Sequence, residues 1–454
     1  MNPIEQRLSE YPRRFGREAL APAVLSEARR RVLDTLGCFF GAYNAKPGRT
    51  LRRTLALPTS GEATLWGTRR KAPAELAAWA NGTCVRTLDY NDTYLSLEPC
   101  HPSDLIASLW AACEIDGRPG QGKRLLRALT LAYETMCRLC DAASLRTRGW
   151  DHVTYLPIAS AVGCSYIFGL DPERTRNAIA LAMTGNNALR QTRVGEISDW
   201  KAACAAYAAR SGLWAARLAA QGFTGPFEAF TGRHGFFAQV SGEFSLSGRP
   251  LESPWKILST HVKYFPAEHH AQSAIEAALE LRGRLGENLS SIKSITIECF
   301  SVATAIIGSE PEKWKPTTRE TADHSMPYLV AAALLDGNIT LSQYERRRFL
   351  DRDIRALMKK TEAIALPKYT RRYPVDMPTR LVIRLADGRV ESAEVIRPKG
   401  YAGNPMSDAD IRAKFDRLSV PLLGEARAAR LADAVLKLER VAKLASFAPL
   451  LEVR

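Results

Sequence analysis

The stretch DWKAACAAYAARSGLWAARLAAQ, residues 199–221, predicts a long helix that begins near Ser198 and ends at Gly222. Alanine dominates this stretch, and alanine is the residue that most favours a helix. Alanine also adds little bulk to the helix surface, so neighbouring helices can approach closely. The stretch therefore indicates a helix packed inside a bundle, and several other helical segments of the chain are rich in alanine in the same way.

Further helices are predicted on the N-terminal side, over about the first 230 residues. Apolar residues recur at helical spacing over 74–89, and a second helix is expected over 103–116, closed by Gly117. Asp171 followed by Pro172 is a strong start signal, an N-cap residue with proline at the first helical position, for a helix that runs to about Thr184. This half of the chain reads as helical throughout.

The pattern changes after about Ser259. Residues 294–299 alternate between polar and apolar, and 380–396 hold two strand-like runs joined at a hairpin turn, Asp387-Gly388. Helices are expected between them, over 269–284 and 328–336, and again from Ser407 to the end. We predict a mainly α protein, in which a large all-helical domain, 1–258 plus 402–454, is interrupted by a smaller α+β domain, 259–401.

Composition restricts the possible partners. The 454 residues include 63 Lys and Arg against 48 Asp and Glu, a net charge of +15, which suits nucleic acid, a membrane surface, an anionic substrate or simply an arginine-rich background. Aromatic residues are not interleaved with basic runs, and no apolar run is long enough to cross a bilayer. The N-terminus, with Glu5 and Glu10, lacks a signal-peptide pattern, and nine scattered cysteines indicate reduced thiols. We expect a cytoplasmic protein with no nucleic-acid or membrane partner.

The densest polar segment is LDYNDTYLSLEPCHPSD, residues 88–104, which lies between two expected helices. It places Asp89, Asp92, Thr93 and His101 in a loop, just before a helix start whose free N–H groups favour an anion. A carboxylate such as Asp89 could orient the imidazole of His101 and tune its pKa for proton transfer near neutral pH. The alternative is that these residues only cap helices and form turns.

Four other segments combine polar residues with helix starts. They are WDHVTYLP (150–157), ALRQTRVGEISDWK (188–201), HVKYFPAEHHAQ (261–272) and ADHSMPY (322–328). In the second of these, Arg193 and Lys201 are natural clamps for carboxylates, because guanidinium and ammonium groups bind them directly. The alternative interpretation is a set of solvated basic positions on a helix surface.

The sequence gives little support for a metal site or a nucleotide-binding site. Cys137 and Cys140 form a CxxC motif in an apolar segment that is predicted to be helical. An iron–sulfur site would need a third thiol such as Cys204. His269 and His270 lack an HExxH frame, and the chain contains no GxGxxG, no GxxxxGK[ST] and no GxSxG motif. We therefore predict no metal and no cofactor.

Taken in order, these segments resemble the MmgE/PrpD family, and most closely its 2-methylcitrate dehydratase branch, over about 20–400. The most specific pieces are NGTCVRTLDYNDTY, CHPSD, ALRQTRVGEISDWK, TGPFEAFTGRHGF, KYFPAEHHAQSA and DHSMPYLVAAALLDG. The resemblance implies a large all-helical domain, a smaller α+β lid, a homodimer, and an active site in a basic cleft that needs no metal or cofactor.

The resemblance also assigns site residues. The family's active-site positions fall on Asp89, Thr93, His101, His152, Lys201, Lys263 and Tyr328. Decarboxylases of the family resemble KxFPxH, whereas this chain has Glu268 at the last position, as dehydratases tend to have. Cys100 departs from the small residue expected before HPSD.

The resulting hypothesis is a lyase that removes water from a 2-methylcitrate-like tricarboxylate to give a 2-methyl-cis-aconitate-like alkene, a step of propionate catabolism. We predict His101 as the base, oriented by Asp89, and His152 or Tyr328 as the acid. Thr93, Arg193, Lys201 and Lys263 are predicted to bind the substrate. The alternatives are another family reaction on a polycarboxylate, such as cis-aconitate decarboxylation or epimerisation of an acid, and a non-catalytic helical dimer.

Overall fold

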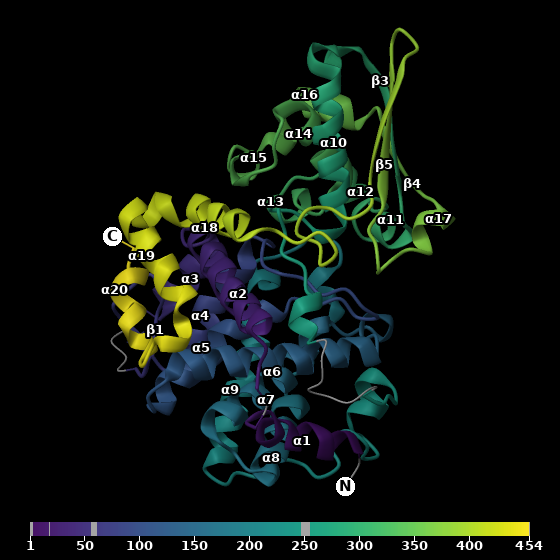
Figure 1. Ribbon diagram of the computed structural model, residues 1–454. Coiled ribbons are helices and arrows are strands. Elements are labelled where there is room, and N and C mark those ends of the chain that lie inside the picture. Colours follow the sequence, from purple (N-terminus) through teal and green to yellow (C-terminus); the bar gives the residue numbers. More distant parts are fainter. Residues whose placement is uncertain (1–2, 18, 56–60, 247–254, 454) are drawn as a thin grey trace. The chain divides into compact units, whose positions relative to one another are not determined.

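The computed structural model describes residues 3–17, 19–55, 61–246 and 255–453, and it divides into two compact units (Figure 1). Unit 1 comprises 1–194, 199–260 and 407–454, and unit 2 comprises 195–198 and 261–406. The two units are described separately below.

Unit 1 is built from helices, with one two-stranded ribbon. Its helices are α1 (Pro3–Phe15), α2 (Pro22–Gly41), α3 (Lys46–Thr54), α4 (Ala74–Thr87), α5 (Ile106–Asp116), α6 (Gln121–Ala142), α7 (Leu156–Phe168), α8 (Pro172–Thr184), α9 (Trp200–Ala220), α18 (Asp408–Leu423), α19 (Glu425–Leu436) and α20 (Ala448–Leu451). The ribbon pairs β1 (Ala63–Thr64) with β2 (Lys71–Ala72) in antiparallel fashion. Short 3-10 turns at Pro102–Leu105 (η1), His152–Tyr155 (η3) and Arg190–Arg193 (η4) precede or follow several of these helices.

The alanine-rich helix α9 occupies the middle of unit 1, where it packs against α4, α7 and α8. Its alanine side chains are mostly buried, as the bundle interpretation of residues 199–221 requires. The close approach is clearest at Gly212, where a Cβ atom would lie only 2.6 Å from the Cβ of Ser160 on α7. Small residues therefore set the spacing between α9 and α7.

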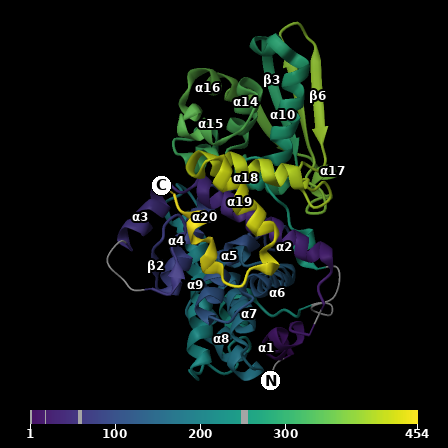
Figure 2. The same ribbon diagram turned by 60° about the vertical axis from the view of Figure 1, so that its left-hand side comes forward.

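The C-terminal segment returns to unit 1 after unit 2. Helix α18 lies beside α2 in both views, yellow against purple (Figures 1 and 2). Farther along, the carbonyl groups of Val441 and Ala442 accept hydrogen bonds from the first two backbone N–H groups of α6. The two ends of the chain thus belong to one helical unit.

Unit 2 combines a four-stranded sheet with helices. The strands are β3 (Ile292–Cys299), β4 (Thr361–Ala365), β5 (Thr379–Leu385) and β6 (Val390–Val395), in the order β4-β3-β5-β6. The helices are α10 (Gln272–Leu285), α11 (Ser301–Ile307), α12 (Pro311–Trp314), α13 (Arg319–Ala322), α14 (Met326–Asp336), α15 (Leu341–Glu345), α16 (Arg352–Met358) and α17 (Pro367–Thr370). Helix α10 packs along β5 and β6 (Figure 2).

The sheet follows the predicted alternation. Ile295, Ile297 and Cys299 are fully buried on one face of β3, which pairs in parallel with β4 and antiparallel with β5. The predicted hairpin joins β5 to β6, with Gly388 in the left-handed region at φ 89°. Glycine suits this position because it has no Cβ atom to clash there.

The mainly helical fold class is confirmed, and the C-terminal region contains a mixed four-stranded sheet. Strand β4 was not predicted, because it is an edge strand whose sequence, TEAIA, is mostly exposed and lacks a clear apolar alternation. Within the described part of the chain, no helix combines the length and the apolar character that crossing a bilayer requires.

Replacing Gly212 with Ala should destabilise the protein by about 1–3 kcal/mol, because the added methyl group forces α9 away from α7. Urea unfolding measures the change. The matched control is Gly185→Ala, since Gly185 has open space around it and a φ of −98°. Equal stabilities of the two variants would contradict the close-packing interpretation.

Candidate active site

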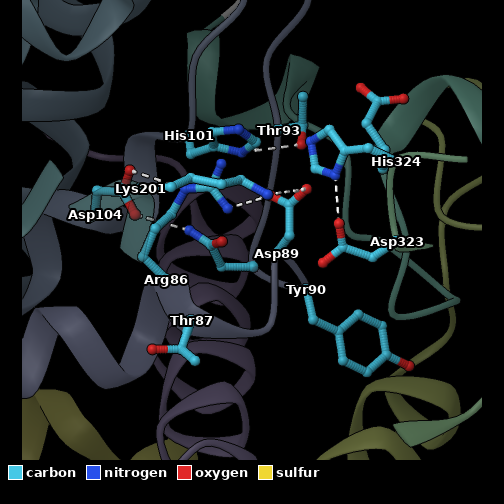
Figure 3. A network of polar contacts seen from close by, with 12 residues as sticks. Arg86, Thr87, Asp89, Tyr90, Thr93, His101, Asp104, Lys201, Asp323 and His324 are labelled. Atoms are coloured by element: carbon cyan, nitrogen blue, oxygen red, sulfur yellow. Dashed lines mark hydrogen bonds and ion pairs between the residues drawn. The ribbon is translucent and has the colours of Figure 1, made fainter. Parts of the chain in front are cut away.

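The loop between α4 and η1 carries the first predicted site residue in an unusual backbone conformation. Asp89 has a φ of 50°, a left-handed value that is uncommon for a residue other than glycine. Its carboxylate forms an ion pair with Arg86, one turn earlier on α4, and lies 3.9 Å from the Nζ atom of Lys201 on α9. All three side chains are buried, and Figure 3 shows them gathered together. Backbone conformations of this kind cluster at functional sites, where the surrounding structure holds them.

His101 is oriented by the backbone of the same loop. Its Nδ1 atom lies 2.8 Å from the carbonyl oxygen of Asp92 and 3.2 Å from the hydroxyl oxygen of Thr93. A carbonyl can only accept, so Nδ1 carries the proton and, in the neutral ring, Nε2 carries the lone pair. The sequence hypothesis gave an orienting role to Asp89, and these contacts show that Asp92 and Thr93 also orient the ring.

His152 lies beside His101, with ring centroids 5.5 Å apart. It opens η3, directly after Asp151, whose carboxylate accepts from the N–H of Val153 and lies 3.2 Å from the Nδ1 atom of His152. Burial lowers the pKa of His152 to about 3; Arg193 adds to this effect, and Asp151 opposes it. Among the described residues, its buried Nε2 atom has no hydrogen-bond partner. The ring is therefore neutral at rest, with one unsatisfied nitrogen.

Arg193 is held by an acidic residue. Its Nε atom lies 2.7 Å from the Oδ2 atom of Asp151. Burial alone would raise the pKa of Asp151, but Arg193 and His152 lower it to about 2, so this carboxylate stays ionised. Arg193 therefore ties η4 to the start of η3, and its charge is largely balanced before any ligand binds.

Two further residues of this cluster, Arg86 and Asp104, escaped the sequence prediction as site residues, and Asp92 was singled out in the loop without a role of its own. Asp104 is buried, accepts a hydrogen bond from the side chain of Asn91 at 2.9 Å, and lies 3.9 Å from the Nε atom of Arg86. Burial raises the pKa of Asp104 to about 7. The charge of Asp92 also raises this pKa, whereas Arg86 and Arg193 lower it. The position of Arg86, three residues before Asp89 and near the end of α4, is the signal that could have identified it.

The cysteines are core residues. All nine are buried, including Cys137 and Cys140 on α6. Burial raises the pKa of Cys100 well above its ordinary value, and the neighbouring thiols of Cys137 and Cys140 raise it further. A thiol must lose its proton to bind a metal, so this group of sulfur atoms is poorly suited to that role.

Unit 2 holds the other two predicted site residues. Lys263 is buried and acts electrostatically on Glu268. Burial would raise the pKa of Glu268, but His270, His324 and Lys263 lower it to about 2. In the same unit, the Nδ1 atom of His270 lies 2.8 Å from the Oε1 atom of Glu268, and His324 contacts Asp323 (Figure 3).

Tyr328 lies in the core of unit 2, on α14. Its ring packs against Tyr344 and Phe349, and its hydroxyl donates a long, 3.5 Å hydrogen bond to the carbonyl of Gln343. Burial raises the pKa of Tyr328 above its ordinary value. The predicted site residues thus fall into two groups: Asp89, Thr93, His101, His152, Arg193 and Lys201 in unit 1, and Lys263 and Tyr328 in unit 2.

The raised pKa of Asp104 predicts a pH dependence of stability. An unfolded aspartate has a pKa of about 3.9, so the folded state binds the extra proton between about pH 4 and pH 7. The contribution of Asp104 to stability is present below pH 4 and is lost as the pH rises to about 7.

Asp104→Asn removes this titration, so the variant should gain stability relative to the wild type from pH 4.5 to 7, by at most about 4 kcal/mol. Urea unfolding at pH 4.5, 6, 7 and 8 measures the difference, which should level off above pH 7. A difference that is the same at every pH would contradict the raised pKa.

Comparison with known proteins identifies the family. The MmgE/PrpD N-terminal domain matches residues 6–249, and the MmgE/PrpD C-terminal domain matches residues 265–440, which include α18 and α19 of unit 1. The chain is 30% identical to a 2-methylcitrate dehydratase from Cupriavidus necator over 394 residues, 80% of this chain and 78% of the relative. It is 30% identical to a 2-methylcitrate dehydratase from Escherichia coli (strain K12) over 405 residues, 82% of this chain and 80% of the relative. A cis-aconitate decarboxylase-like protein from Aspergillus oryzae is 26% identical over 459 residues, 94% of this chain and 93% of the relative. The two domain matches and these long alignments establish that the chain belongs to the MmgE/PrpD family.

Proposed function

We propose that this chain is a cofactor-independent lyase that dehydrates a 2-methylcitrate-like tricarboxylate to a 2-methyl-cis-aconitate-like alkene. One observation carries the proposal: the imidazoles of His101 and His152 are adjacent, and His101 lies beside the buried side chains of Arg86, Asp89 and Lys201 (Figure 3). The similarity to two 2-methylcitrate dehydratases supports the choice of reaction. We extend the proposal to a homodimer, a cytoplasmic location and a place in propionate catabolism.

The difficult step is removal of a proton from carbon next to a carboxylate, because the product is a dianionic enediolate. In the proposed mechanism, the Nε2 atom of His101 takes this proton, since the hydrogen bond to Asp92 keeps the other proton on Nδ1. Fixed positive charge stabilises the enediolate oxygens, and preorganised charge of this kind is often the largest catalytic contribution. Lys201 supplies such charge in unit 1, and Lys263 is our candidate in unit 2.

The carbon–oxygen bond then breaks, and the departing hydroxide takes a proton to leave as water. Of the two predicted acids we favour His152, because its ring lies beside His101, whereas the hydroxyl of Tyr328 is directed to the carbonyl of Gln343. His152 is neutral at rest, so it must gain its proton at Nε2 when the substrate binds. The negative charge of a bound polycarboxylate would raise the pKa of His152 and favour this protonation.

A second candidate, decarboxylation of a cis-aconitate-like acid, is favoured by the match to the fungal decarboxylase-like protein over 94% of this chain. It needs the same stabilisation of a carbanion next to a carboxylate, so the same cations would serve. Release of carbon dioxide, rather than formation of a new alkene from a hydroxy acid, distinguishes the two reactions.

The proposed function is tested by incubating the purified protein, with a chelator present, with 2-methylcitrate, citrate, cis-aconitate and related acids. We expect the ultraviolet absorbance of a new alkene conjugated to a carboxylate to rise with 2-methylcitrate, without release of carbon dioxide. Carbon dioxide from cis-aconitate, with no alkene from any hydroxy acid, would establish the decarboxylase instead. No reaction with any acid of the panel would contradict both.

Replacing His101 with Gln should lower kcat at least about 100-fold, because acid–base catalysis by one group contributes this much or more. The matched control is His234→Gln, which makes the same change at an exposed histidine of unit 1 and should leave kcat unchanged. Initial rates of alkene formation measure both variants. A His101→Gln enzyme within threefold of the wild type would remove His101 from the mechanism.

A further inference from the structure

The conformation of Asp89 needs support from outside its own loop. A residue other than glycine at φ 50° is held in place only where its surroundings oppose relaxation. In this conformation the carboxylate of Asp89 and the ring of Tyr90 point away from each other (Figure 3). The carboxylate reaches Arg86 and Lys201, so relaxation of the backbone would carry it away from both.

The support comes from the far end of the chain. Lys414 lies on α18, is fully buried, and donates a hydrogen bond of 2.8 Å from Nζ to the carbonyl oxygen of Tyr90. The same ammonium group lies 3.8 Å from the centroid of the Tyr90 ring. Lys414 therefore contacts both the backbone and the side chain of the residue that follows Asp89.

Lys414 is fixed in turn by Asp34 on α2. Their Nζ and Oδ1 atoms are 2.7 Å apart, and both side chains are almost completely buried. Taking two charges out of water is costly, and such pairs often add little net stability. A buried pair that ends on a catalytic loop is better explained by the geometry that it imposes.

From these contacts we infer that Lys414, held by Asp34, is a positioning residue that keeps Asp89 in its left-handed conformation and its carboxylate against Arg86 and Lys201. The effects on kcat that this inference predicts rest on the proposed function. It also gives the C-terminal helix α18 a role in the active site, although α18 begins more than 300 residues after the loop.

The test separates positioning from stability by comparing two variants. Lys414→Met leaves Asp34 buried without its ion-pair partner, so this variant should unfold at a lower urea concentration than the wild type. The double variant Asp34→Asn with Lys414→Met removes both charges and should recover most of the lost stability. Because neither variant can hold the Tyr90 carbonyl, both should show kcat lowered at least about tenfold, the scale on which small misplacements act.

The matched control is the double variant Glu75→Gln with Arg217→Met, which removes another ion pair of unit 1, 2.9 Å long, that joins α4 to α9 away from the loop. Its kcat should equal that of the wild type. Recovery of both stability and kcat in the Asp34/Lys414 double variant would overturn the inference, because Lys414 would then serve stability alone.

A readout that does not depend on catalysis separates this inference from the proposed function. If the wild type makes no alkene from any acid, the proposed function fails, and a crystal structure of the stable double variant still tests Lys414. We expect Asp89 to leave the left-handed region and its carboxylate to lose Lys201. An unchanged Asp89 in that structure would overturn the inference.

Discussion

The candidate site depends on how one buried carboxylate, Asp92, holds the loop between α4 and η1. Its Oδ1 atom accepts from the N–H of Ser103, and its Oδ2 atom accepts from the hydroxyl of Tyr133 and lies 3.6 Å from Arg31. With the side chain fixed at both oxygens, the carbonyl of Asp92 is fixed as well, and this carbonyl determines which nitrogen of His101 carries the proton. The side chain of Asp92 thus fixes the loop, and its backbone carbonyl fixes the tautomer of His101, the base in the proposed mechanism.

The charges around this loop are paired before any ligand arrives. Arg86 is matched by Asp89, and Arg193 by Asp151, so these arginines shape the site more than they attract an anion. The pairing also explains why His152 is neutral although Asp151 is adjacent: Arg193 occupies the other oxygen of that carboxylate, and burial removes water. In the proposed reaction, a polyanion bound near His152 would favour the protonated ring, and substrate binding would then be linked to the protonation of His152.

The sequence predicted the helices and the hairpin, because helical spacing and turn residues are local signals, whereas the residues of the candidate site were named from the resemblance to the family. It did not predict β4, since an exposed edge strand carries no apolar alternation. It did not predict the contacts of His101 with Asp92 and Thr93, nor the left-handed backbone at Asp89, which a residue other than glycine does not signal. The sequence also could not predict the direction of the Tyr328 hydroxyl. Residue spacing places Tyr328 on a helix but does not show which carbonyl its side chain reaches.

Buried ionisable groups concentrate around this loop. Asp34, Arg86, Asp89, Asp92, Asp104 and Lys414 are all nearly inaccessible to water, and each of them contacts the loop or a residue that does. A helical bundle gains stability from apolar packing, as α9 shows, and buried ion pairs are a weak way to add to it. The concentration of these buried charges at one loop therefore costs stability. We attribute it to the fixed geometry that the charges give the loop. The return of the chain to unit 1 as α18 contributes to this fixed geometry, because it brings Lys414 to the carbonyl of Tyr90, the residue after Asp89.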